Sequence, residues 1–154
     1  MRLSENCSII QVPAIDIDVA SGVSSNFINM AQGDDLTVII NTGVMGATAA
    51  VTLRQATDSA GTGVKALSYA GSYATTWSAT VASQVDVPVY TAGALTISAT
   101  GDNKCYIIEI NASEVDTDNN FNYVNLEIAD PGVASVASAM LILTKKRSNE
   151  AIAI

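Results

Sequence analysis

An acidic stretch in the C-terminal third of the chain has the spacing closest to known metal chemistry. Asp116, Asp118 and Asn120 follow the D-x-D-x-N pattern of a calcium loop, and Glu127 comes eleven residues after Asp116, where an EF-hand places its bidentate ligand. Phe121 occupies the position at which an EF-hand requires glycine, so that type of site is not expected. Two interpretations remain: a solvated acidic loop, or a weak candidate for another type of calcium site formed by Glu114, Asp116 and Asp118.

Enzymatic chemistry is not expected from the remaining residues. The chain has no histidine, which excludes Ser-His-Asp and Cys-His nucleophile arrangements and every histidine metal site. A glycosidase needs only two carboxylates, but nearly all of the fifteen Asp and Glu fall in turns or at polar strand positions, as Asp34 and Asp102 do. The glycines at 61 and 63 precede a strand rather than a helix, so they lack the helix dipole of a phosphate-binding loop. We therefore predict no catalytic residue and no cofactor.

The composition favours contact with other proteins. Only 14% of the residues are charged, so much of the surface must consist of small neutral side chains, which lose less hydration than Lys or Glu when a partner covers them. Seven basic residues and a net charge of -8 argue against a nucleic-acid partner. Three of the seven, Lys145, Lys146 and Arg147, are interpreted either as the solvated end of the last strand or as a docking site for an acidic protein surface.

Neither a membrane span nor an export signal is visible. No stretch reaches the roughly 18 apolar residues of a span, and the first twenty residues lack a basic start followed by a long apolar run. We expect synthesis in the cytoplasm and no membrane partner. Cys7 and Cys105 have no metal-finger spacing and are expected to be small buried apolar side chains, although a disulfide between them is left open.

Alternation with a period of two dominates the chain and predicts strands. Between Leu36 and Asn41, apolar residues alternate with a half-polar set, which indicates a strand with one buried face. Pro88 places its strand at an edge or a bulge because proline cannot donate to a ladder. The segment 135–144, apolar on both faces near its end, is expected to be a central strand. Further strands are predicted over residues 51–54, 64–69, 77–81, 85–90, 95–99, 105–110 and 123–128.

About eight strands with turns between them predict an all-β fold, namely a two-sheet, jelly-roll-like sandwich with extended terminal arms. We assign residues 1–25 to an N-terminal arm with a first short strand, 26–144 to the sandwich domain and 145–154 to a C-terminal tail. The terminal segments are expected either to bind a partner or to fold back onto the domain. The expected partner-binding residues are Ile9, Ile10, Ile15, Ile17, Lys145, Lys146, Arg147, Ile152 and Ile154.

The sequence between Asp35 and Tyr69 resembles that of a known group of proteins. An apolar strand ends in Asn-Thr-Gly at 41–43, a second strand reads Val-Thr-Leu-Arg-Gln-Ala at 51–56, and the loop at 58–63 leads to Lys65. These features are similar to small β-rich proteins that are encoded beside the major capsid protein of tailed bacteriophages and serve as head decoration, or cement, proteins. The resemblance covers less than a quarter of the chain and carries no catalytic motif.

The resemblance implies a jelly-roll or related fold, self-association as a dimer or trimer, and binding to the major capsid protein. The expected function is therefore that of a virion structural protein on the outer capsid surface, made in the host cytoplasm, which stabilises the head by bridging capsomers. An alternative is a virion module that recognises carbohydrate or a host surface through Trp77, Tyr69 and Tyr73. A tail or head-completion protein, which would form a ring, is a further alternative.

Overall fold

The computed structural model describes residues 7–11, 17–18, 22–67, 74–78, 81–87, 90–91, 94–100 and 102–144. In this part of the chain, fourteen strands form two antiparallel sheets, and the helical elements are three-residue 3-10 turns. The predicted all-β, two-sheet sandwich is confirmed. Five strands are only two residues long, which leaves nine longer strands where about eight were expected. No helix within these residues has the length and apolar character needed to cross a membrane.

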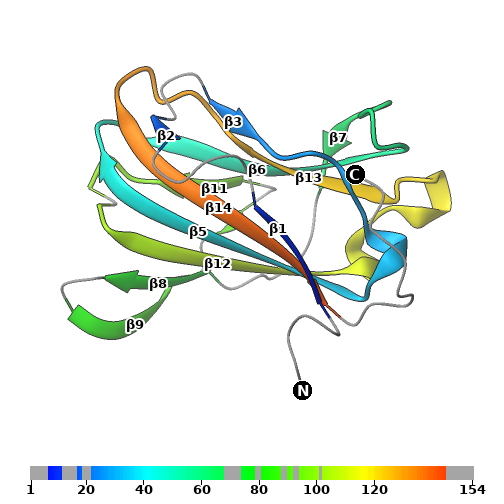
Figure 1. Ribbon diagram of the computed structural model, residues 1–154, viewed down its shortest axis with the longest axis horizontal. Helices are drawn as coiled ribbons and strands as arrows, with labels where there is room; N and C mark the ends of the chain where they lie inside the picture. Colours follow the sequence, from blue (N-terminus) through cyan, green and yellow to red (C-terminus); the bar gives the residue numbers. More distant parts are fainter. Residues whose placement is uncertain are drawn as a thin grey trace.

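The two sheets are named after their central strands, β5 and β6 (Figure 1). The β5 sheet has the order β1 (Cys7–Gln11), β14 (Ser135–Thr144), β5 (Asp35–Met45), β12 (Lys104–Asn111), β8 (Ala74–Ser78) and β9 (Val81–Val87), and β2 (Ile17–Asp18) also pairs with β14. The β6 sheet has the order β10 (Tyr90–Thr91), β11 (Ala94–Ile97), β6 (Ala49–Ala56), β13 (Tyr123–Ile128) and β3 (Val23–Ser24). In that sheet β4 (Ile28–Asn29) also pairs with β13, and β7 (Lys65–Ala66) with β6. The 3-10 turns are η2 (Met30–Gln32), η3 (Ala112–Glu114) and η4 (Thr117–Asn119).

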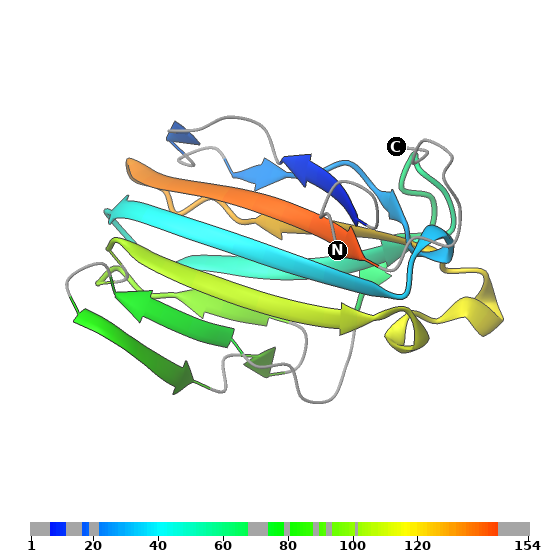
Figure 2. The ribbon, with the colours of Figure 1, turned by 60° about the horizontal axis from the view of Figure 1, so that its bottom comes forward.

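The sandwich is built from pairs of consecutive strands. Each pair has one strand in either sheet, and the pairs lie next to one another. β5 continues into β6, and this pair of strands lies beside β14 and β13 on one flank and beside β12 and β11 on the other. This wrapping of paired segments around both sheets is the feature that a jelly-roll-like sandwich requires (Figure 2). Where β5 turns towards β6, a Cβ on Gly46 would lie 2.5 Å from the carbonyl oxygen of Ala134, so glycine lets the two corners approach each other.

The described part of the N-terminal segment lies against its own domain. β1 pairs with residues 140–144 of β14, and β2 pairs with residues 136 and 137 of the same strand. Residues 7–11 and 17–18 therefore both pair with the same edge of β14. Of the two interpretations of the N-terminal arm, the structure has the folded-back one for residues 7–11 and 17–18.

The same segment then forms an edge of the β6 sheet. β3 and β4 pair with the two ends of β13, and Ser25 lies between them. The backbone N–H of Ser25 donates to the carbonyl of Leu126 at 2.8 Å, and its hydroxyl oxygen accepts from the Leu126 N–H at 2.9 Å. The Ser25 hydroxyl thus takes the place of a backbone carbonyl as the acceptor for the Leu126 N–H. The edge strand can therefore hold one more residue than β13 does between the two pairings.

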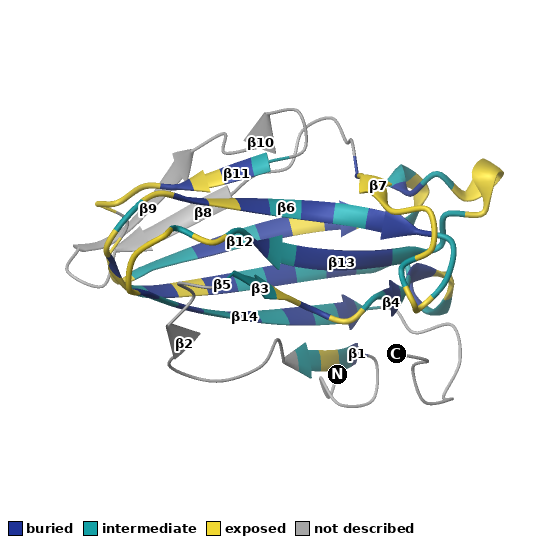
Figure 3. Ribbon diagram, turned by 90° about the horizontal axis from the view of Figure 1, so that it is seen from above, coloured by how far each residue is buried: buried dark blue, intermediate teal, exposed yellow. Residues whose placement is uncertain are grey.

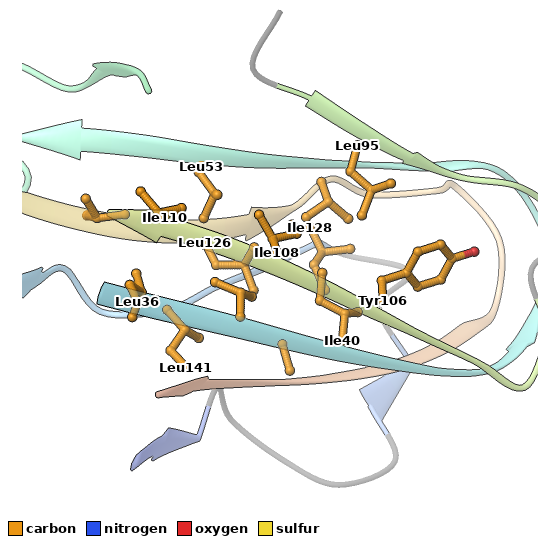
Figure 4. Close-up of a cluster of buried hydrophobic side chains, with 14 of the residues drawn as sticks. Leu36, Ile40, Leu53, Leu95, Tyr106, Ile108, Ile110, Leu126, Ile128 and Leu141 are labelled. Carbon is orange, nitrogen blue, oxygen red and sulfur yellow. The ribbon is translucent and has the colours of Figure 1, made fainter. Parts of the chain in front are cut away.

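The core lies between the two sheets and is filled mainly by aliphatic side chains, with Tyr106 and two methionines among them (Figures 3 and 4). The alternation expected around Leu36 is confirmed, because Leu36, Val38 and Ile40 have no exposed surface while the residues between them are only partly buried. Such burial stabilises a domain by roughly 1.5–3 kcal/mol per large aliphatic side chain. The largest members of this core include Ile28, Leu53, Leu95, Ile108, Ile110, Leu126 and Leu141.

Several predicted strands have the expected bounds. β13 and β14 match the predicted ranges, and β14 pairs on both sides, with β5 and with β1, as a central strand should. The predicted strands at 51–54, 95–99 and 105–110 correspond to β6, β11 and β12. Of the predicted strand at 64–69, residues 65 and 66 form β7. Residues 68 and 69 lie outside the described part of the chain.

Two predictions between residues 77 and 90 were wrong. The run 77–81 is not one strand, because β8 ends at Ser78 and pairs antiparallel with β9, which begins at Val81. The run 85–90 is likewise divided: β9 ends at Val87 in the β5 sheet and β10 begins at Tyr90 in the β6 sheet. Pro88 explains the second division, because a ladder cannot continue through a residue without an N–H.

Candidate functional site

Two neighbouring hollows occupy the end of the sandwich where β5 begins and β12 ends. Their volumes are about 420 Å³ and about 640 Å³, and both are lined by Asn111 and Ser113. Met30, Asn122 and Thr117 contribute to the smaller hollow, together with turns η2 and η3. The carboxylates around the two hollows are Asp34, Asp35, Glu109 and Glu114. The end of the sandwich is therefore polar and acidic.

Asn111 organises the wall that the two hollows share. Its amide oxygen accepts from the Ser113 N–H at 2.9 Å, and its amide nitrogen donates to the Asp35 carboxylate at 2.8 Å. A Glu114 carboxylate oxygen accepts from the Asn111 N–H at 2.9 Å, which completes a capping box on η3. The Ser113 hydroxyl donates to the Asn111 amide oxygen, which is too weak a base to activate a nucleophile. The arrangement fits cations or hydroxyl groups and repels phosphate.

The three residues of the calcium candidate have different partners. Glu114 caps η3 as described, Asp116 forms an ion pair with Lys65, and Asp118 is exposed on η4. Within the described residues, no group of three or more Cys, Asp or Glu side chains is placed to hold a metal ion. The acidic stretch is thus a loop of two 3-10 turns whose carboxylates point to separate neighbours.

A cluster that sequence reasoning missed joins this loop to the loop between β6 and β7. Lys65 donates to the Asp116 carboxylate and lies with its Nζ 3.9 Å from the centroid of the Phe121 ring. The Asn119 amide donates to the same carboxylate at 2.9 Å, and the Asp116 N–H donates to the Gln55 side chain at 2.9 Å. Hydrogen bonding, first to Lys65 and then to Asn119, lowers the pKa of Asp116 below its ordinary value.

The β6–β7 loop has its own internal order. The Asp58 carboxylate accepts from the backbone N–H groups of Ala60 at 3.0 Å and Thr62 at 2.9 Å, and the bonds from Thr62 are the main reason that the pKa of Asp58 is lowered. Gly61 has φ +82°, and a Cβ there would come within 2.7 Å of the Phe27 ring. The antiparallel pairing of β6 with β7 makes this glycine-containing segment a hairpin loop.

The predicted partner-binding residues fall into two groups. Ile9 is 51% exposed, and Ile10 is partly buried against the core. Ile17 lies in β2, where the structure describes the backbone. The others lie outside the described residues: Ile15, Lys145, Lys146, Arg147, Ile152 and Ile154.

The face of the β5 sheet that is turned away from the core, called the outer β5 face below, carries an apolar row. Ile39 lies directly between Met140 of β14 and Ile107 of β12. All three are partly exposed, and none belongs to the buried core cluster or packs against it. Ile142 lies on the same face, opposite the exposed Ile9. The residues that alternate with the core positions are thus not uniformly polar, as a solvated face would be.

A second surface is the free edge of the β5 sheet. β9 pairs only with β8 among the described strands, and β8 is joined to β12 by the register pairs at Lys104 and Cys105. The β8–β9 hairpin consequently extends to one side of the sandwich (Figure 2). β9 reads Val-Ala-Ser-Gln-Val-Asp-Val, with one charged residue and neither lysine nor proline. Natural proteins usually protect such an edge with lysine, proline or a covering segment.

The two cysteines cannot form the disulfide that the sequence left open. Both thiols are free. Cys7 lies in β1 and Cys105 in β12, and β14 and β5 run between them. Three strand spacings alone separate them by about 14 Å, and the register places Cys7 level with Asn111, six residues along β12 from Cys105, whereas a disulfide needs Cα atoms within about 7 Å. Cys7 is buried as expected; Cys105 is only partly so, and burial raises the pKa of its thiol.

Comparison with known proteins gave no relative for this chain: no family model, curated protein or solved structure matches it. The aromatic residues of the carbohydrate alternative are also not placed. Tyr69 and Tyr73 lie outside the described residues, and Trp77 is described through the backbone of β8.

Proposed function

We propose that this protein is a non-enzymatic structural component of a virion. It binds the major capsid protein on the outer surface of the head and stabilises the shell by bridging capsomers. The edge of β9 carries the proposal, because among the described strands β9 pairs only with β8, and its seven residues, one of them charged, offer a row of backbone hydrogen-bonding groups to a neighbouring chain.

Two other properties support a role in permanent contact. Charged residues are scarce, so covering the surface forfeits little hydration. The described chain also offers, besides the β9 edge, the outer β5 face to a second copy of itself, so that one assembly would engage the lattice through more than one β9 edge. A protein that engages a lattice at two places dissociates far more slowly than either contact alone would allow.

The test is binding to capsids that lack the protein. Purified wild-type protein is added to such capsids, and bound protein is measured by co-sedimentation together with the temperature at which the shells break open. We expect saturable binding in a fixed ratio to the major capsid protein and a higher breaking temperature. Absence of saturable binding to capsids of the virus that encodes the chain would refute the proposal.

The role of the β9 edge is tested with a charge-matched pair of double variants. Ser83→Lys/Val85→Lys places two lysines on the edge strand, and Thr96→Lys/Ser98→Lys places two at exposed positions at and just after β11. Both variants change the net charge equally. If β9 adds to a strand of the capsid, the first variant loses binding at least tenfold and the second keeps it. Equal loss in both would show that the edge is not the contact.

A further inference from the structure

The apolar row on the outer β5 face lies at the middle of the longest strand. Ile39 is the fifth residue of the eleven in β5, and the register places Met140 and Ile107 on either side of it. One flanking row contains Ser138, Asn41 and Cys105, and the other contains Ile142, Thr37 and the exposed Glu109. The row is therefore an apolar centre inside a mostly neutral rim that carries one carboxylate, a composition that suits a protein interface.

The size of this face fits one protein partner. Strands lie about 4.8 Å apart and rise about 3.4 Å per residue, so β1, β14, β5 and β12, with 5, 10, 11 and 8 residues, present about 550 Å², towards the small end of specific interfaces. A standard interface buries about 800 Å² on each partner. By contrast, the outer face of the β6 sheet carries the ion pair between Arg54 and Glu127, with N and O atoms 2.9 Å apart.

The charges on the outer β5 face select an orientation. Glu109 and Asp35 lie towards one end of the strands, and the opposite end contains Gly43 and Val136, with Asp18 placed beside Val136 at the sheet edge by the register of β2. Two copies packed face to face with antiparallel strands would place the end of each that carries Glu109 and Asp35 over the less acidic end of the other. A parallel arrangement would bring the carboxylates together in a molecule that already carries a net charge of -8.

We infer that the outer β5 face binds a second copy of this chain, in a two-fold symmetric, sheet-on-sheet dimer whose axis passes near Ile39. An isologous interface needs only a patch that is complementary to itself, and a flat apolar row at the centre of a sheet satisfies that condition. The inference stands independently of the proposed capsid function, because it concerns the free protein in solution.

The experiment is sedimentation equilibrium of the full chain between about 1 and 100 μM, where a dimer with a micromolar Kd forms. Wild type is expected to reach the mass of two chains. Ile39→Lys places a charge on the axis and is expected to keep the mass of one chain throughout, with an unchanged circular dichroism spectrum. Thr96→Lys, which puts the same charge at an exposed position of β11 in the other sheet, should dimerise like wild type.

Crosslinking decides the question if Ile39→Lys fails to fold. Ile39→Cys in a Cys105→Ser background should oxidise to a disulfide-linked dimer, since a residue beside a two-fold axis meets its own copy, whereas Thr96→Cys in the same background should not. A wild-type protein whose sedimentation mass is that of one chain at every concentration would overturn the inference. So would a folded Ile39→Lys variant that still dimerises, a trimer, or equal crosslinking at positions 39 and 96.

Discussion

At the scale of the single residue, Lys65 holds together two loops that are far apart in sequence. It binds Asp116 across 51 residues and lies over the ring of Phe121. In Lys65→Met, the largest cause of the lowered Asp116 pKa is removed, so the titration midpoint of that carboxyl, followed by NMR, should rise towards the ordinary aspartate value. The charge-neutral Met keeps most of the apolar contact with Phe121, so the shift reports the ion pair.

The same ion pair makes stability depend on pH in a defined direction. An aspartate whose pKa is lower in the folded than in the unfolded state stabilises the fold above its unfolded pKa, and this contribution is lost as pH falls through the folded value. The difference in unfolding free energy between wild type and Lys65→Met should therefore be present at neutral pH and vanish in acid. Lys104→Met, a lysine in the described chain outside this cluster, should leave the Asp116 midpoint unchanged. A midpoint that moves equally in both variants would contradict the assignment.

The sequence holds no sign that Lys65, Phe121 and Asp116 meet. Their contact depends on the β6–β7 loop and the 112–122 loop arriving at the same end of the sandwich, which follows from the pairing of β6 with β13. The D-x-D-x-N spacing was visible, but spacing alone does not give the direction of a side chain. In the structure the carboxylates serve a lysine and a turn cap instead of one shared ion.

At the scale of the element, β12 shows how alternation divides one strand between two environments. Ile108 is 1% exposed and faces the core, while its neighbour Ile107 lies on the outer β5 face. We expect Ile108→Ala to lower the unfolding free energy by about 2–5 kcal/mol, because it leaves a cavity in a close-packed core. Ile107→Ala creates no cavity and should cost less than about 1 kcal/mol.

Urea denaturation followed by Trp77 fluorescence measures both variants. The protein concentration is kept as low as the signal allows, so that loss of any dimer contact does not add to the cost of Ile107→Ala. Equal losses for the two substitutions would mean that Ile107 also lies in a packed interior and would overturn the assignment of the outer face.

The pairing of β1 and β2 with the edge of β14 gives a second prediction at this scale. Deleting residues 1–18 removes the buried Cys7 and the partly buried Ile10, and it uncovers the edge of β14. We expect a loss of about 2–4 kcal/mol in unfolding free energy, from the burial of these two side chains, and a higher tendency to aggregate through the open edge.

Differential scanning calorimetry and light scattering are the measurements for the deletion. A chain that lacks only residues 1–6 is the control and should keep the wild-type melting temperature, because β1 begins at Cys7. If deletion of residues 1–18 changes neither stability nor scattering, the pairing of β1 with β14 does not contribute to the folded state in solution.

Periodicity predicted the long strands because one face of each is buried. β5 was predicted over residues 36–41 of its eleven, and the bounds of β13 and β14 could be read from the sequence. It failed at 77–81, where apolar and polar residues alternate through a turn without glycine, asparagine or proline to mark it. It also gave no indication of β2, β3, β4 and β10, because two-residue strands exist only through their partners.

At the scale of the whole molecule, strand order could not be predicted. β1 pairs with β14 and β5 with β12 across most of the chain, and these choices depend on how the buried faces fit together in three dimensions. The composition could predict the class, because few charges and an alternating pattern suit a thin sandwich that presents neutral surfaces. The apolar character of the outer β5 face could have been predicted from the sequence. Its residues Ile39, Ile107 and Met140 occupy positions that should be polar if that side of the strands were solvated.

Net charge should govern how strongly two copies associate. Each carries -8, and the centres of two domains of this size in contact lie about 30 Å apart, so unscreened repulsion opposes an interface that is itself nearly uncharged. The Debye length falls from about 20 Å to about 4 Å between about 0.02 M and 0.5 M NaCl, which removes most of that repulsion. We expect the dimer Kd, measured by sedimentation equilibrium, to fall about tenfold over this range. A Kd that rises with salt would instead indicate attraction between opposite charges across the interface, which this face does not provide because its charged residues, Glu109, Asp35 and Asp18, are all acidic.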